Sequence, residues 1–151
     1  HKGDFKVKKN KIMKQIKIEE KQGIFTVKKY FDFFKRIKKQ KEKINKLINK
    51  NKNKFIVGYG APAKVTTFCH VFNLGKREIR FIADDNDLKQ NKYTPGKNIK
   101  IINFNHLMNI NFDYIIILAW NFSEAIMRKL KKNIRKRKYK IIIPFPNLKV
   151  V

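Results

Sequence analysis

Cysteine is almost absent from this chain, since Cys69 is the only one in 151 residues. A single thiol excludes a disulfide framework and a cluster of thiolate metal ligands. It fits a reducing compartment, and we expect a cytoplasmic protein. Long apolar runs are also missing, because residues 114–120 and 141–146 have the length of strands, whereas a membrane span needs about 20 residues. We therefore expect no membrane partner and, without a secretory signal at the basic N-terminus, no export.

Acidic residues are scarce: 11 Asp and Glu stand against 38 Lys and Arg, a formal charge of +27. Such a charge suggests a nucleic-acid-binding module. However, lysine greatly outnumbers arginine, the residue best suited to bidentate phosphate and base recognition. The lysines are also spread along the whole chain, as A/T-rich codon usage would produce. We interpret most of them as solvated surface and expect only non-specific binding of polyanions.

The first half of the chain has two parts. Residues 1–7 alternate enough for a short strand, and the lysine run after them is expected to be an exposed edge or a disordered arm. From about Thr26 to Asn51, apolar residues recur at steps of three and four, which predicts one long amphipathic helix. Its other face is rich in lysine, so the helix is expected to pack on a domain and to be solvated outside.

The second half alternates short apolar segments with helical ones. Strands are expected at residues 55–59, 78–83, 100–102, 114–120 and 139–143, and helices at 61–73, 103–109 and 122–138. Apolar strands that alternate with helices indicate a parallel sheet covered on both faces. The predicted fold is therefore α/β: a Rossmann-like three-layer domain with a mainly parallel sheet, preceded by the long amphipathic helix. Ligands of such folds bind at the carboxyl ends of the strands.

The first candidate site follows the first of these strands. Gly58-Tyr-Gly-Ala-Pro-Ala63 fits the G-x-G-x-x-(G/A) pattern between a strand and a helix. Gly58 would make the tight turn, and Gly60 would let the backbone approach a phosphate. Lys64 would reach a pyrophosphate, and Thr67, together with Thr66, would add hydroxyl donors. The alternative is a tight strand-to-helix turn that binds nothing.

Further candidates lie at the ends of later strands. Asp84 and Asp85 follow the second strand, where an acid of this fold grips a ribose; alternatively they cap their own loop. Lys89 and Tyr93 are expected on the same rim as the glycine turn. Asn121 would cap the next helix or bond a ligand, and Trp120 before it would stack on a base or join the core.

Residues for acid–base, nucleophilic or metal chemistry are not evident. His70 and His106 lie in predicted helices without partners at metal-ligand or triad spacing, and we interpret both as structural. No Ser-His-Asp arrangement and no acid–base carboxylate pair stands out. We therefore predict neither a catalytic residue nor a metal site in this chain.

Five motifs occur in order and resemble a known family: Gly58-Tyr-Gly-Ala-Pro-Ala-Lys-x-Thr-Thr67, Asp84-Asp-Asn, Lys89-Gln-x-x-Tyr-Thr-Pro-Gly96, Leu118-Ala-Trp-Asn121 and Ile143-Pro-Phe-Pro146. They are similar to the C-terminal domain of S-adenosylmethionine-dependent C-methyltransferases that act on nucleotide-linked deoxysugars. The resemblance spans residues 25–146. The segment that begins at His1 is similar to the end of the family's preceding methyltransferase domain, although Lys2 and Asp4 depart from it. Residues 1–20 are thus expected to be a remnant of that domain, and residues 21–151 the C-terminal domain.

The resemblance implies that this chain is the acceptor-binding part of the enzyme. Tyr59, Gly60 and Lys64 would hold the nucleotide diphosphate of a dTDP-type sugar, with Asp85, Lys89 and Tyr93 nearby as rim contacts. The predicted acceptor site also includes Gly58, Ala61, Thr67 and Asn121. S-adenosylmethionine and the catalytic acid–base residues of the family belong to a domain that these residues do not contain, supplied in cis or in trans. We therefore expect a fragment that is inactive alone.

Two other functions stay open at this point. An NAD(P)-binding oxidoreductase domain would share the glycine turn and Asp85, although no catalytic Tyr-Lys or His pair accompanies them. A basic nucleic-acid-binding module is the other alternative, and it rests on the charge alone.

Overall fold

The computed structural model describes residues 9–134 and 137–151, and the chain divides into one unit within residues 1–39 and a second at 40–151. The first unit contains α1 (Lys9–Lys21) and the first part of α2 (Val27–Lys50). Gly23, with φ +69°, turns the chain between them. The expected strand at 1–7 lies outside the described residues.

Helix α1 corrects one prediction, because the lysine run was expected to be an exposed edge or a disordered arm. Ile16 follows Met13 by three residues and Ile12 by four, which is helical spacing. None of the described side chains of α1 is buried. The lysines between these apolar residues obscured the pattern.

Helix α2 confirms the long amphipathic helix. Near its C-terminal end, Ile44 and Ile48 are one turn apart and only 1% and 3% exposed. These two side chains belong to the second unit and join its core. No helix of the described residues is both long enough and apolar enough to cross a membrane.

The second unit is built on a six-stranded sheet in the order β3-β2-β1-β4-β5-β6. Its strands are β1 (Ile56–Tyr59), β2 (Phe81–Ala83), β3 (Lys100–Ile102), β4 (Tyr114–Ile117), β5 (Lys140–Ile143) and β6 (Lys149–Val150). The first five run parallel, and β6 pairs antiparallel with β5. The mainly parallel sheet is confirmed. The strand order reverses beside β1, so the carboxyl ends of β1 and β4 form the topological switch point of the fold.

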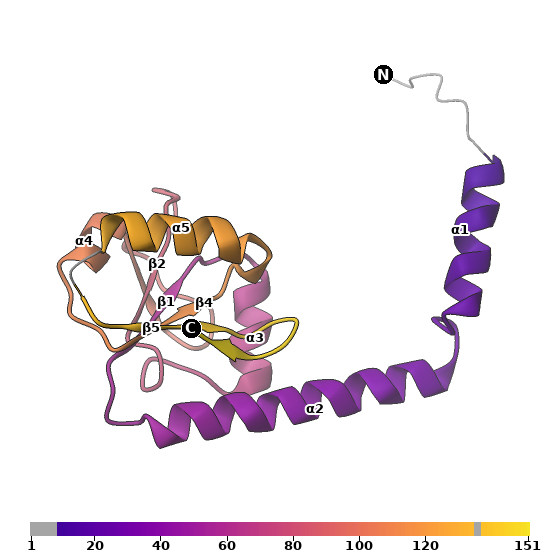
Figure 1. The fold of residues 1–151 in the computed structure, drawn as a ribbon, viewed down its shortest axis with the longest axis horizontal. Coiled ribbons are helices and arrows are strands. Elements are labelled where there is room, and N and C mark those ends of the chain that lie inside the picture. The colour runs from indigo at the N-terminus through magenta and orange to yellow at the C-terminus, as the bar shows by residue number, and fades with distance from the viewer. Residues whose placement is uncertain (1–8, 135–136) are drawn as a thin grey trace. The chain divides into compact units, whose positions relative to one another are not determined.

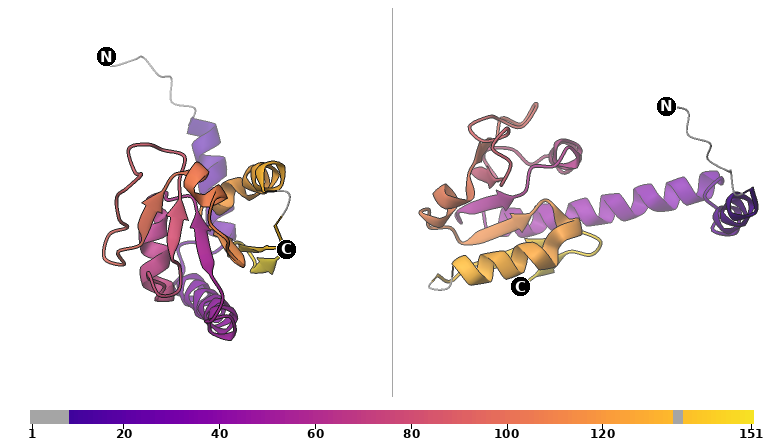
Figure 2. Two further views of the ribbon diagram at one scale, coloured as in Figure 1. Left: turned by 90° about the vertical axis from the view of Figure 1, so that its left-hand side faces the viewer. Right: turned by 90° about the horizontal axis from the view of Figure 1, so that it is seen from above.

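Helices cover both faces of this sheet, as Figures 1 and 2 show. On one face lies α3 (Lys64–Phe72) with the last turns of α2, and on the other lie α4 (Phe104–Met108) and α5 (Ser123–Asn133). Alternate strand residues divide between the two cores: Ile56, Ile82 and Ile116 face α3, and Val57, Ile115 and Ile117 face α5. The three-layer arrangement follows from this period-two alternation of buried side chains.

Several elements are shorter than predicted. Helix α3 begins at Lys64, not at 61, and α5 ends at Asn133, not at 138. Strand β4 ends at Ile117, after which a short 3-10 helix, η1 (Trp120–Phe122), turns the chain into α5. Strand β6 was not expected, because Pro144 and Pro146 were interpreted only as the end of the preceding strand.

Candidate functional site

The glycine turn joins β1 to α3 at the switch point of the sheet. A Cβ atom on Gly58 would lie 2.8 Å from Leu118 Cδ1, and one on Gly60 would lie 2.6 Å from Ala119 Cβ. Gly60 also has φ +87°, a conformation that residues with a Cβ rarely adopt. Both glycines are therefore required by the close approach of β1 to the chain that follows β4, whether or not a ligand binds there.

Asp84 closes this turn from the end of β2. Its Oδ2 accepts a hydrogen bond of 2.5 Å from the Ala61 N–H, and its Oδ1 accepts one of 2.9 Å from the Asn86 N–H. The Gly60 N–H donates to the Ala83 carbonyl oxygen at 2.7 Å. Asp84 is only 8% exposed, and Lys89 Nζ is 3.8 Å from its Oδ2. Asp84 thus caps the loop, and the first two N–H groups after Tyr59 already have acceptors within the chain.

Lys64 begins α3 and lies over the ring of Trp120. Its Nζ is 3.9 Å from the Trp120 ring centroid and donates to Asn121 Oδ1 at 3.0 Å. Burial lowers the pKa of the Lys64 ammonium below its ordinary value. Among the residues at 9–134 and 137–151, no carboxylate forms an ion pair with it. The charge of Lys64 is therefore supported by an amide and an aromatic face but is not neutralised.

Trp120 belongs to an aromatic cluster on the α3 face of the sheet. Its ring centroid lies 4.9 Å from that of Phe145 and 5.9 Å from that of Phe68. Core packing, one of the two expectations, therefore accounts for this ring. Asn121 does not cap α5, whose N-cap residue is Phe122 without a side-chain bond. Its amide holds Lys64 instead.

A second polar group lies at the same edge, on the α5 face. Tyr59 Oη donates to Asp85 Oδ2 at 2.8 Å, and Lys129 Nζ donates to Asp85 Oδ1 at 2.6 Å. Lys129 Nζ is also 4.3 Å from the centroid of the Phe104 ring. We call Tyr59, Asp85 and Lys129 the edge triad.

The ionisation of the edge triad follows from burial and from these bonds. Burial chiefly raises the pKa of Tyr59 to about 12, and the bond to Asp85 adds to the rise. Burial would raise the pKa of Asp85, but the bonds from Lys129 and Tyr59 outweigh it, so this pKa is lowered. Burial likewise would lower the pKa of Lys129, but its bond to Asp85 raises it. The triad is therefore a neutral phenol beside a carboxylate–ammonium pair.

Lys129 was missed by the sequence analysis. It lies on α5 more than forty residues beyond Asp85 and is one of 38 basic residues, so no local pattern distinguishes it. Only the three-dimensional pairing with Asp85 shows that it belongs to this edge.

The other predicted residues are partly brought together. Lys89 lies beside Asp84, and Thr67 is exposed on α3 one turn beyond Lys64. Tyr93 is placed differently from the expectation of a shared rim. Its backbone forms an antiparallel bridge with Lys100, the first residue of β3, so it lies beside the amino end of that strand.

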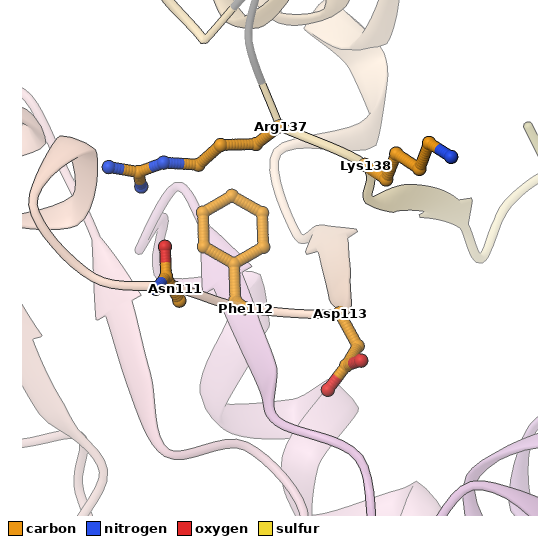
Figure 3. Close-up of a pocket in the computed structure, with 5 residues that line it drawn as sticks. All are labelled: Asn111, Phe112, Asp113, Arg137 and Lys138. Carbon is orange, nitrogen blue, oxygen red and sulfur yellow. The ribbon is translucent and has the colours of Figure 1, made fainter.

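The pocket in Figure 3 lies at the opposite edge of the sheet, before β4 and β5. It has a volume of about 320 Å³ and is lined by Asn111, Phe112, Asp113, Arg137 and Lys138. The Arg137 guanidinium donates to the Ile110 carbonyl oxygen at 2.8 Å, and Asp113 accepts bonds from the Phe55 N–H and from Lys54. The charges of Arg137 and Asp113 are thus engaged within the chain, and the pocket does not coincide with the predicted site.

The described residues provide no evidence for a metal site or a reactive thiol. No group of three His, Cys, Asp or Glu side chains there is placed to hold a metal ion. Cys69 is 1% exposed, and burial raises the pKa of its thiol to about 11. A buried thiol of this kind is unreactive.

Comparison with known proteins identifies the family. The model of the C-methyltransferase C-terminal domain matches residues 1–146. The chain belongs to this family. It is similar to the C-methyltransferase NovU of Streptomyces niveus, with 31% identity over 135 residues that cover 88% of this chain and 32% of the relative. The chain thus spans about a third of the length of that relative. The family-level resemblance inferred from the five motifs is confirmed.

Proposed function

We propose that this chain is the acceptor-binding part of an S-adenosylmethionine-dependent C-methyltransferase whose acceptor is a nucleotide-linked deoxysugar. The membership of the chain in the C-methyltransferase C-terminal domain family supports the reaction class. The assignment of a nucleotide-sugar as the acceptor rests on the resemblance of the five motifs and on the chemistry of the switch point. In this proposal the chain binds and orients the acceptor and contains no catalytic residue.

The observation that carries the proposal is the uncompensated charge of Lys64 at the start of α3. Its ammonium is fixed at 3.0 Å from Asn121 Oδ1 and 3.9 Å above the Trp120 ring, without a carboxylate partner among the described residues. Helix α3 has no side-chain cap at its N-terminus. The first N–H groups of a helix and its dipole attract phosphate. The N–H groups of Val65 and Thr66 already bond the carbonyl oxygens of Pro62 and Ala63, at 2.9 and 3.2 Å, so a diphosphate at this end of α3 would meet chiefly the helix dipole and the Lys64 ammonium.

The methyl donor is proposed to bind elsewhere in the enzyme. The N–H groups of Gly60 and Ala61 are bonded to Ala83 and Asp84, and the Asp84 carboxylate repels another carboxylate. The described residues therefore do not fit the carboxylate of S-adenosylmethionine at the glycine turn. A methyltransferase domain, in cis or in trans, would hold the donor that supplies the methyl group. We accordingly expect the isolated chain to transfer none.

The same contacts weigh against any pyrophosphate on the N–H groups of the turn, which an NAD(P)-binding domain requires, and the diphosphate of the acceptor is therefore proposed to lie at Lys64 and not on the turn. Dinucleotide-binding turns present free N–H groups to the pyrophosphate. Here the Asp84 carboxylate takes the Ala61 N–H, and both oxygens of Asp85 already accept bonds from side chains. NAD is therefore included below as a competing ligand.

Calorimetric titration of the chain with dTDP, dTDP-glucose and NAD at physiological salt tests the proposal. We expect the two dTDP ligands to bind more tightly than NAD. Lys64→Ala should weaken dTDP binding by about tenfold or more, because a hydrogen bond to a charged group contributes about 1.5–3 kcal/mol.

Lys97→Ala is the matched control. Lys97 Nζ bonds Asn73 Oδ1 at 3.0 Å, the same kind of pair at the same distance, but at the other end of α3. It should leave dTDP affinity unchanged. Equal affinity of the unaltered chain and Lys64→Ala, or tighter binding of NAD than of dTDP, would contradict the proposal.

A further inference from the structure

The edge triad has a different electrostatic character from the Lys64 site, although both lie at the carboxyl edge of the sheet. Lys129 is neutralised by Asp85 at 2.6 Å, whereas Lys64 has no carboxylate partner among the described residues. An uncompensated ammonium favours an anion, and an ion pair with a neutral phenol beside it favours a polar but uncharged group.

The two sites lie on opposite faces of the sheet. Lys64 is the first residue of α3, and Lys129 is on α5, which covers the other face (Figure 1). Tyr59 lies in the glycine turn between them, and its side chain belongs to the core on the α5 face. A ligand bound across this edge would meet Lys64 at one end and the edge triad at the other.

The hydrogen bonds within the edge triad determine which member can best donate to such a ligand. The phenolic hydrogen of Tyr59 is used on Asp85 Oδ2, and Asp85 as a carboxylate has no hydrogen to give. The Lys129 ammonium has three hydrogens, and one of them bonds Asp85 Oδ1. Lys129 is therefore the member of the triad that has further hydrogens to donate to a ligand.

Lys129 is also held in position. Its Nζ is 2.6 Å from Asp85 and lies 4.3 Å from the Phe104 ring centroid and 5.6 Å from that of Tyr59. The Tyr59 residue is only 3% exposed, so this ring is itself fixed by the core. A donor fixed before binding loses little conformational freedom when a ligand arrives.

We infer that Lys129 is a positioning residue for the uncharged sugar part of the acceptor, to which it donates a hydrogen bond at a hydroxyl or carbonyl oxygen. This inference rests on the proposed function. It assigns an orientation: the diphosphate toward α3 and Lys64, and the sugar toward α5 and Lys129. The orientation makes the sugar contribution to affinity separable from that of the nucleotide diphosphate.

The test compares dTDP with dTDP-glucose, which share the diphosphate and differ by the sugar. In calorimetric titrations, Lys129→Met should lower the affinity for dTDP-glucose by about tenfold and change the affinity for dTDP by no more than about twofold. Lys129→Arg, which keeps the charge and the donors, should recover part of the loss. Lys132→Met, an exposed lysine on the same helix, is the matched control and should change neither affinity. Lys129→Gln removes the ammonium but keeps an amide that can bond Asp85, and it replaces Lys129→Met if that variant does not fold.

The outcomes separate this inference from the proposed function. If Lys64→Ala loses affinity for dTDP while Lys129→Met binds dTDP-glucose as tightly as the unaltered chain does, only the role of Lys129 is overturned. An equal loss of dTDP and dTDP-glucose in Lys129→Met would also overturn it, since the residue would then act on the diphosphate or on the fold. Should Lys129→Met not fold, a selective loss of dTDP-glucose binding by Lys129→Gln supports the inference, and unchanged affinity for dTDP-glucose overturns it. If the unaltered chain binds neither ligand, both proposals fall.

Discussion

Adjacent aspartates at the end of β2 have separate tasks. Asp84 bonds the Ala61 N–H on the α3 side of the edge, and Asp85 bonds Lys129 on the α5 side. Successive side chains of an extended chain point to opposite faces, so two neighbouring residues of one type serve two different layers. Asp84 stabilises the loop, and Asp85 sets the position of Lys129.

Gly60 is the residue whose replacement should disturb the site most directly. Gly60→Ala would place a Cβ 2.6 Å from that of Ala119 at φ +87°, and we expect it to lower the free energy of unfolding by about 1–3 kcal/mol. Urea denaturation measures the loss. Gly75→Ala is the control, because its nearest neighbour would be 3.7 Å away, and it should cost less. Equal effects of the two substitutions would show that the close approach to Ala119 does not constrain the turn.

The sequence could locate this site but could not assign its contacts. The spacing of Gly58, Gly60 and Lys64 after an apolar strand indicated the turn, because strand, glycine and helix signals are local. Whether Asp84 or Asp85 faces the turn depends on the pleat of β2. The role of Lys129 depends on how α5 packs across the sheet. Both are tertiary properties, and one lysine among 38 basic residues carries no local signal.

Helix α2 has one apolar face with two different environments. Ile44 and Ile48 are 1% and 3% exposed, whereas Tyr30, Phe31 and Phe34 are 57%, 62% and 65% exposed. Burial stabilises a fold only where the apolar surface is removed from water. The C-terminal turns of α2 therefore contribute to the core of the second unit, and these aromatic residues contribute little to folding.

Two substitutions on this one helix should therefore differ sharply. Ile44→Ala removes a buried side chain, and we expect it to lower the free energy of unfolding of the second unit by about 2–5 kcal/mol. Phe31→Ala removes exposed surface and should change stability by no more than about 0.5 kcal/mol. Thermal or urea unfolding compares the two directly. A large loss in Phe31→Ala would mean that the aromatic residues are buried in solution.

The elements with a strong apolar periodicity could be predicted from the sequence, and those with a weak one could not. The strands of the parallel sheet were found because their apolar residues are continuous, and α2 because its apolar steps extend over 24 residues. Helix α1 was missed because its apolar residues are few and separated by lysine. Strand β6, only two residues long, depends on pairing with β5, which no local pattern specifies.

The net charge of the whole molecule should govern how it binds polyanions. With a formal charge of +27, the chain should bind duplex DNA at low salt, and affinity should fall linearly on a plot of log affinity against log salt. Fluorescence titration with two unrelated duplexes at several salt concentrations measures this. Both should bind equally, since the charge is spread over the surface. A preference for one duplex that persists at physiological salt would instead support a dedicated nucleic-acid interface.

The three-layer architecture was accessible from the sequence for a physical reason, and the family was accessible through the resemblance of the five motifs. Five apolar strands alternating with amphipathic helices permit few other arrangements of a parallel sheet. How the charge of each lysine is compensated was not accessible, because it depends on partners far apart in the chain, such as Lys129 with Asp85 and Lys54 with Asp113.

Both edges of the sheet offer little to another extended polypeptide. Beside β3, the Asn91 N–H donates to the Ile101 carbonyl oxygen at 2.9 Å, and the Ile101 N–H donates to that of Lys92 at 2.8 Å. At the other edge, β6 has only two residues and carries Lys149. Short, charged or covered edges resist the addition of foreign strands. Self-templated fibril growth and pairing with a strand of another protein are therefore disfavoured at this sheet.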